Sequence, residues 1–333
     1  MAINRRDFVK LIAGSGLFLA TNPVPASASS KTLSPEAVGI LYDSTLCIGC
    51  KSCMVNCKKY NSMPGGALYQ KDGSIPYEHI APYEIYDAPA DLSSKTLNII
   101  KAHKNDTLTS PESSLSEYSF IKMHCLHCVD PACVSVCPVG ALQKNPENGV
   151  VSYDKNKCFG CRYCQVACPF GIPKFEWHEA KPEIRKCQLC QHRFSSGGYS
   201  ACCEFCPTGA SIFGRVIDLQ QEAKLRLGLT PGSYYKYPIQ TVTSSQRIPQ
   251  KVAGYYNHIY GLNESGGTQY LLMAGVPFDR LGLNPRITDQ AYPDLTWSYI
   301  TKVPWLIAGL LVAGTVTQYL TRKNTMQGRD KNI

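Results

Sequence analysis

Sixteen of the 17 cysteines in this chain of 333 residues fall into four tight groups. The groups are Cys47, Cys50, Cys53, Cys57; Cys125, Cys128, Cys133, Cys137; Cys158, Cys161, Cys164, Cys168; and Cys187, Cys190, Cys202, Cys206. The first and third have the spacing C-x2-C-x2-C-x3-C, which binds [4Fe–4S] clusters in bacterial ferredoxins. Because each cluster needs four thiolates, sixteen cysteines suffice for four clusters. A chain with that many one-electron centres is predicted to carry electrons.

An internal duplication relates the four groups. The first and third lie in the pattern Tyr-Asp-x3-Cys-x-Gly-Cys-x2-Cys-x-Val-x-Cys, which begins at Tyr42 and again at Tyr153. The second and fourth share Ala-Cys-x3-Cys-Pro-x-Gly-Ala. Because Cys202 aligns with Cys133 in this repeat, Cys203 is the spare cysteine, interpreted as a small buried apolar residue. We therefore predict an α+β fold, a duplicated bacterial-ferredoxin-like domain of two bis-[4Fe–4S] units with insertions.

The residues around the cysteines suit cluster loops. Gly49 and Gly160 permit the close backbone approach that a cluster sulfur requires. Backbone N–H groups in such loops are expected to donate hydrogen bonds to sulfur and to raise the reduction potentials. Zinc is the main competing metal for C-x2-C pairs, but its structural sites usually combine two pairs across a longer loop. The runs of closely spaced cysteines favour iron–sulfur clusters.

The N-terminal residues predict export. Arg5 and Arg6, followed by Phe8 and Lys10, have the pattern of a twin-arginine signal, and the small residues 26–28 suit a cleavage site. The alternative is a short basic helix. We interpret residues 1–28 as a signal peptide, because export of a folded protein allows clusters to be inserted before the thiols meet an oxidising compartment.

The C-terminal region predicts a membrane anchor. Residues 303–321 form an uncharged segment that is just long enough to cross a bilayer, and basic residues follow it. We expect a single transmembrane helix at 301–321 and a cytoplasmic tail at 322–333. The positive-inside rule then places the rest of the chain on the periplasmic face of the inner membrane. The alternative is a buried amphipathic helix, since polar residues dilute the segment.

Between these ends, the predicted cluster domain covers residues 29–215. Residues 59–118, rich in Pro, Gly, Ser and Tyr, are expected to form a long surface insertion that docks a partner. Residues 216–300 are interpreted as a connector packed against the cluster domain, with one helix from Asp218 to Leu227.

Composition and motifs narrow the function. The net charge of +9 does not indicate nucleic acid, because four oxidised clusters would each contribute roughly −2 and bring the loaded protein close to neutral. The chain lacks nicotinamide, zinc-protease and serine-hydrolase motifs, so we predict no catalytic site. Three histidines next to the cysteines, His124, His127 and His192, are expected to form local hydrogen bonds.

Residues 42–215 resemble the four-cluster iron–sulfur subunits of anaerobic respiratory oxidoreductases, most strongly those of membrane-bound periplasmic hydrogenases. The features that carry this resemblance are the C-x2-C-x4-C-x3-C-P second group, the widened fourth group and Gly266-Gly267-Thr268-Gln269. The resemblance implies that the first group pairs with the fourth and the second with the third, with the last cysteine of each crossing over. The implied ligand sets are set 1 (Cys47, Cys50, Cys53, Cys206), set 2 (Cys57, Cys187, Cys190, Cys202), set 3 (Cys125, Cys128, Cys133, Cys168) and set 4 (Cys137, Cys158, Cys161, Cys164).

The resemblance also implies partners. The expected function is electron relay through four [4Fe–4S] clusters between a periplasmic [NiFe] hydrogenase, with its small and large subunits, and an integral membrane quinone-reactive subunit. One alternative is the same role in a formate dehydrogenase or another molybdenum enzyme. A second alternative is a mainly structural anchor for a catalytic subunit.

Overall fold

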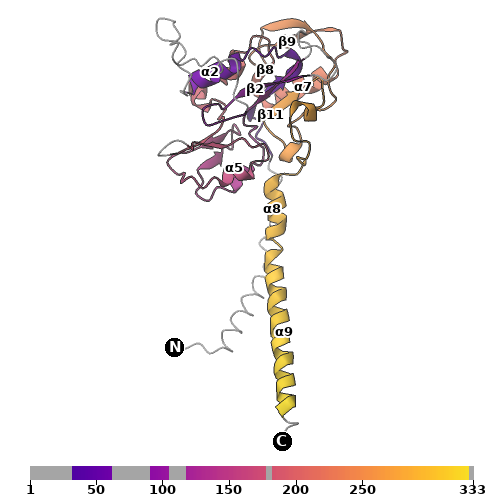
Figure 1. Cartoon of the computed structure of the whole chain (residues 1–333). Coiled ribbons are helices and arrows are strands. Elements are labelled where there is room, and N and C mark those ends of the chain that lie inside the picture. Colours follow the sequence, from indigo (N-terminus) through magenta and orange to yellow (C-terminus); the bar gives the residue numbers. More distant parts are fainter. Residues whose placement is uncertain (1–31, 62–90, 105–117, 178–181, 330–333) are drawn as a thin grey trace. The chain divides into compact units, whose positions relative to one another are not determined.

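The computed structural model describes residues 32–61, 91–104, 118–177 and 182–329. The chain divides into two compact units, one formed by residues 30–292 and the other by residues 1–29 together with 293–333 (Figure 1). The predicted signal peptide at 1–28 lies outside the described residues.

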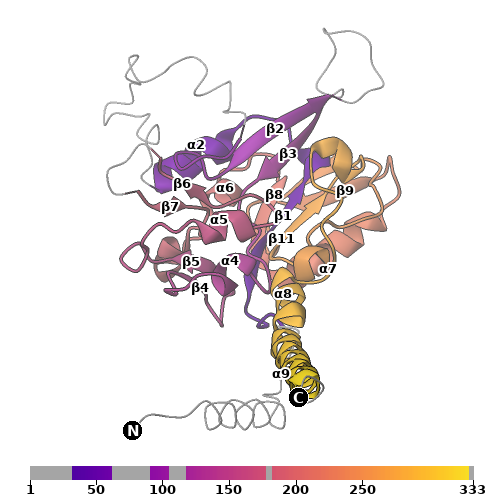
Figure 2. The same ribbon diagram turned by 60° about the horizontal axis from the view of Figure 1, so that its bottom comes forward.

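A three-stranded sheet forms the centre of the first unit. Strand β1 (Val38–Asp43) pairs with β8 (Ser211–Arg215) antiparallel and with β11 (Tyr270–Met273) parallel (Figure 2). Both faces of β1 are buried: Leu41 packs toward one apolar cluster, whereas Ile40 and Tyr42 belong to the cluster that also contains several of the grouped cysteines. The alternation of side chains along a strand thus directs one face of the sheet toward the cysteine groups.

Hairpins and short helices surround this sheet. The hairpins are β2 (Ile99–Lys104) with β3 (Tyr118–Met123), β4 (Leu142–Lys144) with β5 (Val151–Tyr153), β6 (Lys174–Phe175) with β7 (Ile184–Arg185), and β9 (Tyr234–Pro238) with β10 (Arg247–Lys251). The helices are α2 (Ser52–Tyr60), α4 (Ala132–Ser135), α5 (Tyr163–Ala167), α6 (Ala201–Glu204) and α7 (Val216–Leu227), with single 3-10 turns η1 (Ser44–Leu46), η4 (Gln191–Ser196), η5 (Glu264–Gly266) and η6 (Phe278–Leu281).

The segment predicted as a connector is largely part of the first unit. Helix α7 agrees with the helix expected from Asp218 to Leu227, and it packs against all three strands of the central sheet. Strand β11, also from this segment, completes that sheet. Residues 216–292 therefore belong to the same compact unit as the cysteine groups.

The predicted surface insertion at 59–118 is partly core. Its residues 62–90 and 105–117 lie outside the described residues, but Leu97, Ile99 and Ile100 are buried. Strand β2 pairs along its whole length with β3, which leads into the second cysteine group. This part of the insertion therefore supports the cysteine loops from within.

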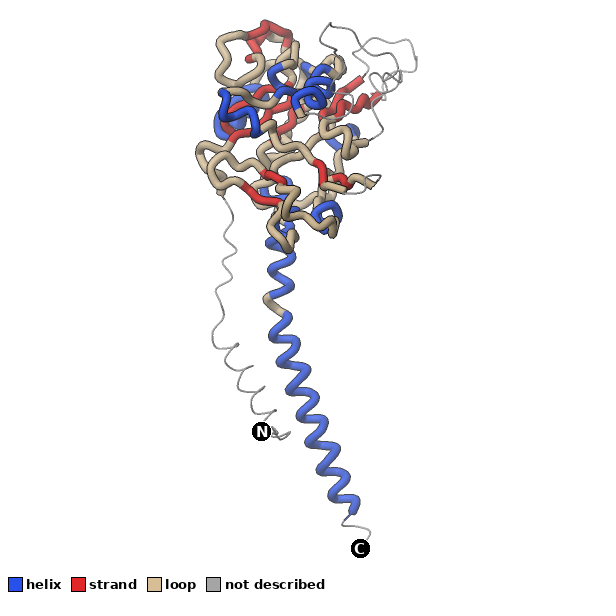
Figure 3. The backbone as a smooth tube through the Cα atoms, turned by 90° about the vertical axis from the view of Figure 1, so that its left-hand side faces the viewer, coloured by secondary structure: helices blue, strands red, loops and turns tan. Residues whose placement is uncertain are grey.

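The second unit contains the helical C-terminal region. Helix α8 (Tyr292–Ile300) begins at the border of the first unit, and α9 (Val303–Arg329) follows it as one continuous helix (Figure 3). None of the helices in the described ranges combines the length and the apolarity needed to cross a membrane. The structure thus has a helix over all but the first two residues of 301–321, but it does not support the assignment of this segment as a transmembrane span. Thr315, Thr317 and Gln318 interrupt the apolar run, and the helix continues through most of the predicted tail.

A fully buried ion network joins the first cysteine group to α7. Arg226 donates hydrogen bonds to Asp43 (Nη1 to Oδ2, 3.0 Å) and to Glu222 (Nε to Oε1, 2.9 Å). The Tyr255 hydroxyl also donates to Asp43 Oδ2 (2.7 Å), while Oδ1 accepts from the backbone of Thr45 (3.0 Å). Because Thr45 lies in the 3-10 turn before Cys47, this network fixes the entry into the cysteine loop.

We expect Asp43→Asn to lower the free energy of unfolding by about 3 kcal/mol or more, because it leaves the buried Arg226 with one compensating charge fewer. Denaturant unfolding measures the change. Asp218→Asn is the matched control: Asp218 pairs with the half-exposed Arg215, so its loss costs under about 1 kcal/mol. Equal losses for the two variants would contradict the importance of the buried network.

Candidate iron–sulfur sites

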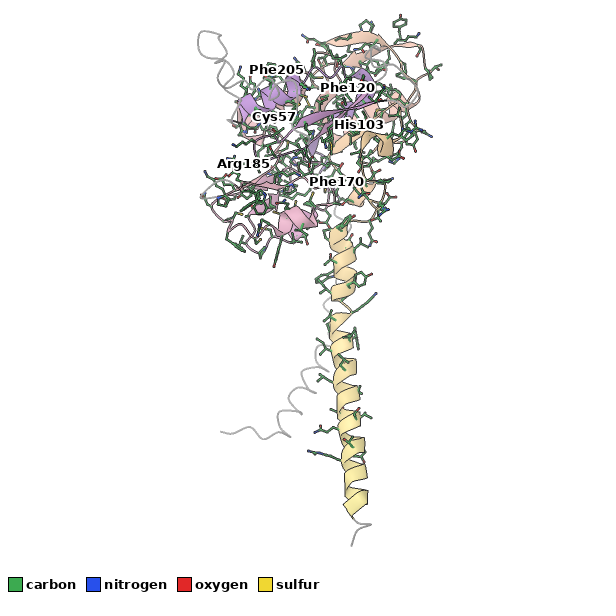
Figure 4. All side chains as sticks on the ribbon, in the orientation of Figure 1. Cys57, His103, Phe120, Phe170, Arg185 and Phe205 are labelled. Carbon is green, nitrogen blue, oxygen red and sulfur yellow. The ribbon has the colours of Figure 1, made fainter. Side chains whose placement is uncertain are left out.

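Two pairs of short helices bring the four cysteine groups together. Helix α2, from the first group, packs against α6, from the fourth, and α4, from the second, packs against α5, from the third. The first pair is tied by the Ser52 hydroxyl, which donates to the Phe205 carbonyl (2.9 Å), and by the stacked rings of Tyr60 and Phe205 (centroids 5.5 Å apart). Figure 4 marks Cys57 and Phe205 in this region. The pairing of groups implied by the resemblance is therefore the pairing of helices in the fold.

The four cysteines of set 1 line one common cavity. Tyr42 and Ser211 line it as well. Burial, together with the nearby sulfurs of Cys47 and Cys206, raises the pKa of Cys53 to about 12. Thiols in such a space stay protonated unless a cation compensates their charge, and this is what iron does when a cluster binds.

The four cysteines of set 2 line a second common cavity. Burial raises the pKa of Cys57, and the sulfurs of Cys187, Cys202 and Cys190 add to this effect. His124 lines the same space, and its Nε2 has no hydrogen-bond partner among the described residues. Four thiols that line one cavity form a donor set that fits a [4Fe–4S] cluster.

Sets 3 and 4 are defined by the same kind of proximity. Burial raises the pKa of Cys128, and the sulfurs of the other three members of set 3 add to this effect, whereas Lys144 opposes it. Burial raises the pKa of Cys164 to about 11, and the sulfurs that repel its charge are the other three members of set 4. The structure thus brings together each of the four sets, including the cysteine that crosses over from the partner group.

Cysteines of successive sets lie close to one another, and these neighbours connect the sets in a series. Cys53 of set 1 lies near Cys202 of set 2. Cys187 of set 2 lies near Cys125 of set 3, and Cys133 of set 3 lies near Cys164 of set 4. The sets therefore follow one another from 1 to 4.

Several sulfurs accept hydrogen bonds, as the sequence predicted. The backbone N–H of Ala141 donates to Cys137 Sγ (3.2 Å), that of Leu189 to Cys187 Sγ (3.4 Å) and that of Ser211 to Cys206 Sγ (3.4 Å). A side chain that sequence reasoning missed, Asn61, donates to Cys190 Sγ (3.6 Å) of set 2.

The duplication is visible in the backbone and in the repeated Tyr-Asp pair. Lys51 and Arg162, which follow the second cysteine of their groups, both have positive φ (59° and 65°). The Tyr42 hydroxyl is hydrogen-bonded to Cys47, and the repeat partner Tyr153 is hydrogen-bonded to Cys158 in the same way. The signal for this role was present in the sequence, since Tyr-Asp stands five residues before Cys in both copies.

The spare cysteine is buried but not isolated. Cys203 is fully buried, as predicted, and it lies outside the set 2 cavity that Cys202 lines. Hydrogen bonds from Cys203 and Lys122 help to lower the pKa of Cys202 to about 6. Cys202, which the repeat aligns with Cys133, therefore lines the cavity, and the contact of Cys203 with its sulfur was not foreseen from the repeat.

The three histidines make the local contacts that were expected. His124 Nδ1 pairs with the Cys125 carbonyl (2.8 Å), and burial lowers its pKa to about 3, so it is neutral. His127 Nδ1 accepts from the Val151 backbone (3.0 Å), and His192 Nε2 pairs with the Tyr60 carbonyl (3.0 Å).

The described residues contain no group of three or more His, Cys, Asp or Glu side chains placed to hold a single metal ion. A single zinc ion needs its sulfurs about 2.3 Å from one point. A cubane instead binds each thiolate through a different iron, so its four cysteines line a common cavity, as those of sets 1 and 2 do.

Comparison with known proteins agrees with these sites. The family model for a 4Fe-4S dicluster domain matches residues 116–216. Hydrogenase-2 operon protein HybA of Escherichia coli O157:H7 is 41% identical over 293 residues, which cover 86% of this chain and 85% of that protein. The formate dehydrogenase iron-sulfur subunit of Haemophilus influenzae is 31% identical over 68% of this chain and 64% of its own length. The nitrate-inducible formate dehydrogenase iron-sulfur subunit of Escherichia coli K12 is 30% identical over 71% of each chain.

We expect Cys202→Ser to lower the iron content of the purified protein by about a quarter, because it removes one thiolate from one of four sites. Cys203→Ser is the matched control, one residue away, and should keep the full iron content. Iron analysis with electron paramagnetic resonance (EPR) distinguishes them. The assignment is overturned by a loss of iron in the Cys203 variant alone.

Proposed function

This chain belongs to the family of [4Fe–4S] electron-transfer subunits that includes hydrogenase-2 HybA and the formate dehydrogenase iron–sulfur subunits, and on this premise we propose that it relays electrons between a periplasmic [NiFe] hydrogenase and a quinone-reactive membrane subunit. The observation that carries the proposal is the linear order of the four cysteine sets. The proteins it matches are electron-transfer subunits, not catalytic ones.

The residues of the chain hold, insulate and tune the sites. Each bound cluster supplies a one-electron couple. The cysteines of sets 2 and 3 are buried or half-buried, so the middle of the series is shielded from water. The backbone donors of Ala141, Leu189 and Ser211 favour the more negative, reduced state of a cluster by their hydrogen bonds to sulfur.

The two ends of the series, sets 1 and 4, are more accessible to solvent than the middle, which supports docking of one partner at each end. Cys50 of set 1 is exposed, and so is the neighbouring Ile48. Around set 4, the exposed apolar side chains are Phe159, Tyr163, Val166 and Trp177. We name these four residues the set 4 patch. Apolar patches of this kind on a soluble unit mark interaction surfaces, so we propose that a redox partner covers the set 4 patch.

We propose that the protein works on the periplasmic face of the inner membrane. The support is in the sequence: the paired arginines at 5 and 6 and the small residues at 26–28 suit twin-arginine export. In this proposal, the integral membrane quinone-reactive subunit connects the relay to the quinone pool.

A molybdenum enzyme is the second candidate for the electron donor. Formate dehydrogenase iron–sulfur subunits are 30–33% identical to this chain, whereas the hydrogenase-2 protein is 41% identical over a larger share of it. The higher identity over a larger share of the chain favours a hydrogenase as the electron donor. A purely structural anchor would not need the sulfur-directed hydrogen bonds, and copurification of the membrane complex identifies the donor directly.

Cys57→Ser, which breaks set 2 in the middle of the series, is expected to abolish hydrogen-dependent quinone reduction in membranes. Reduction of an artificial dye by the hydrogenase should persist, because it bypasses the relay. Cys203→Ser serves as the control and should support both reactions. Quinone reduction that survives in the Cys57 variant, with the cluster of set 2 absent by EPR, would contradict the relay.

Val166→Glu in the set 4 patch is expected to reduce copurification with one partner at least tenfold, because a desolvated charge at an apolar interface is costly. Tyr234→Glu, at an equally exposed position on β9, is the control and should leave copurification unchanged. Pull-down from solubilised membranes followed by quantitative immunoblotting measures the change. Unchanged copurification of every partner with the Val166 variant would exclude this docking surface.

A further inference from the structure

A buried lysine lies between sets 1 and 2. Lys122, in β3, is only 1% exposed. Its ammonium donates a hydrogen bond to Ser211 Oγ (3.1 Å) and another to the sulfur of Cys202 in set 2. The same charge also acts on Cys53 in set 1. One cation therefore contacts one set and influences its neighbour.

In the part of the chain that the structure describes, no carboxylate forms an ion pair with Lys122. The charged or ionisable groups that act on its ammonium are Cys202, Cys203, Tyr270 and Cys53. An unpaired ammonium in a protein interior costs several kcal/mol, so buried lysines are retained where an anion compensates them. The anions available here are cysteine sulfurs, and thus the negative charge of loaded sets 1 and 2.

The position of this ammonium is fixed by the surrounding structure. The Lys122 carbonyl accepts from the Tyr270 hydroxyl (2.7 Å), and its strand is paired to β2. Ser211, which accepts from the ammonium, donates its own backbone N–H to Cys206 Sγ of set 1 (3.4 Å). Ser211 thus links the ammonium to set 1, while the direct hydrogen bond reaches set 2.

Two other lysines near the cysteines are held differently. Lys144 donates to three neutral oxygens, the carbonyls of Cys128 (2.7 Å) and Gly149 (2.9 Å) and Gln269 Oε1 (2.8 Å). Lys186 donates to the carbonyls of Val151 and Cys187. Their hydrogen bonds go to backbone and amide oxygen atoms, so they brace loops, whereas Lys122 is directed at a ligand sulfur.

We propose that Lys122 is a positioning residue that raises the reduction potentials of the clusters at sets 1 and 2, most strongly at set 2, and so keeps electrons moving through this half of the series. Reduction adds a negative charge to a cluster, and a fixed positive charge next to its ligands stabilises that reduced form. This inference rests on the proposed function, because it tunes the same relay.

EPR-monitored redox titration of the full-length, cluster-loaded protein tests this. Lys122→Met is expected to shift the reduction equilibrium of set 2 at least tenfold toward the oxidised form, about 59 mV to lower potential for a one-electron couple. Set 1 should shift less in the same direction, and sets 3 and 4 should not move. Lys122→Arg keeps the charge and should restore the original potentials. The EPR signal that disappears in Cys57→Ser, a variant that lacks one ligand of set 2, is assigned to the cluster of set 2.

Lys144→Met is the matched control, because Lys144 is buried next to set 3 but bonds to oxygen atoms. It should leave sets 1 and 2 unchanged. Should Lys122→Met lose iron, the neutral but hydrogen-bonding Lys122→Gln is titrated instead and is expected to show the same direction of shift. Unchanged potentials for sets 1 and 2 in a fully loaded Met or Gln variant overturn the inference.

The titration separates this inference from the proposed function. Potentials are measured on the loaded protein and need neither hydrogenase nor quinone. A shift in reduction potential that is confined to sets 1 and 2 supports the role proposed for Lys122, even if the protein serves a different enzyme. If a Lys122 variant has unchanged potentials and still couples hydrogen oxidation to quinone reduction, the role proposed for Lys122 is rejected and the proposed relay is not affected.

Discussion

The crossing of one cysteine from each group into its partner's set is the constraint on which the rest of the structure depends. Helix α2 carries Cys53 of set 1 and Cys57 of set 2, so two sites share one rigid element. Four residues of α-helix advance about 6 Å, at about 1.5 Å per residue, so adjacent sites are necessarily close. The same sharing repeats at α5, which carries Cys164 of set 4 and is followed by Cys168 of set 3, whereas sets 2 and 3 meet through Cys187 and Cys125. An electron path is thus a consequence of how the helices pair.

Burial of the thiols couples this path to folding. The raised pKa values of Cys53, Cys133 and Cys164 mean that their thiolates are costly to bury without iron, so each bound cluster stabilises the fold that surrounds it. The central sheet provides the frame: one face meets α7, and the other meets the cysteine groups. The Asp43–Arg226 network connects the two faces at the start of the first cysteine loop.

The sequence predicted what is local and repeated. Cysteine spacing indicated the sites, the duplication distinguished Cys202 from Cys203, and helical periodicity located α7. Features that depend on distant residues were not predictable. Strand β11 pairs with β1 across more than 200 residues of sequence, and Asn61 and Lys122 reach their sulfurs through tertiary packing that spacing does not encode. The membrane-spanning assignment of 301–321 rested on the absence of charge, and none of the described helices has the length and apolarity that such a span needs.

An electron-density map of the cluster-loaded protein with anomalous scattering at the iron edge tests the central claim most directly. The account predicts four iron clusters in a line, with Cys57 bonded to the same cluster as Cys187, Cys190 and Cys202. A cluster held by Cys47, Cys50, Cys53 and Cys57 together would contradict it, because no cysteine would then cross between groups and the shared helix would no longer set the order of the relay.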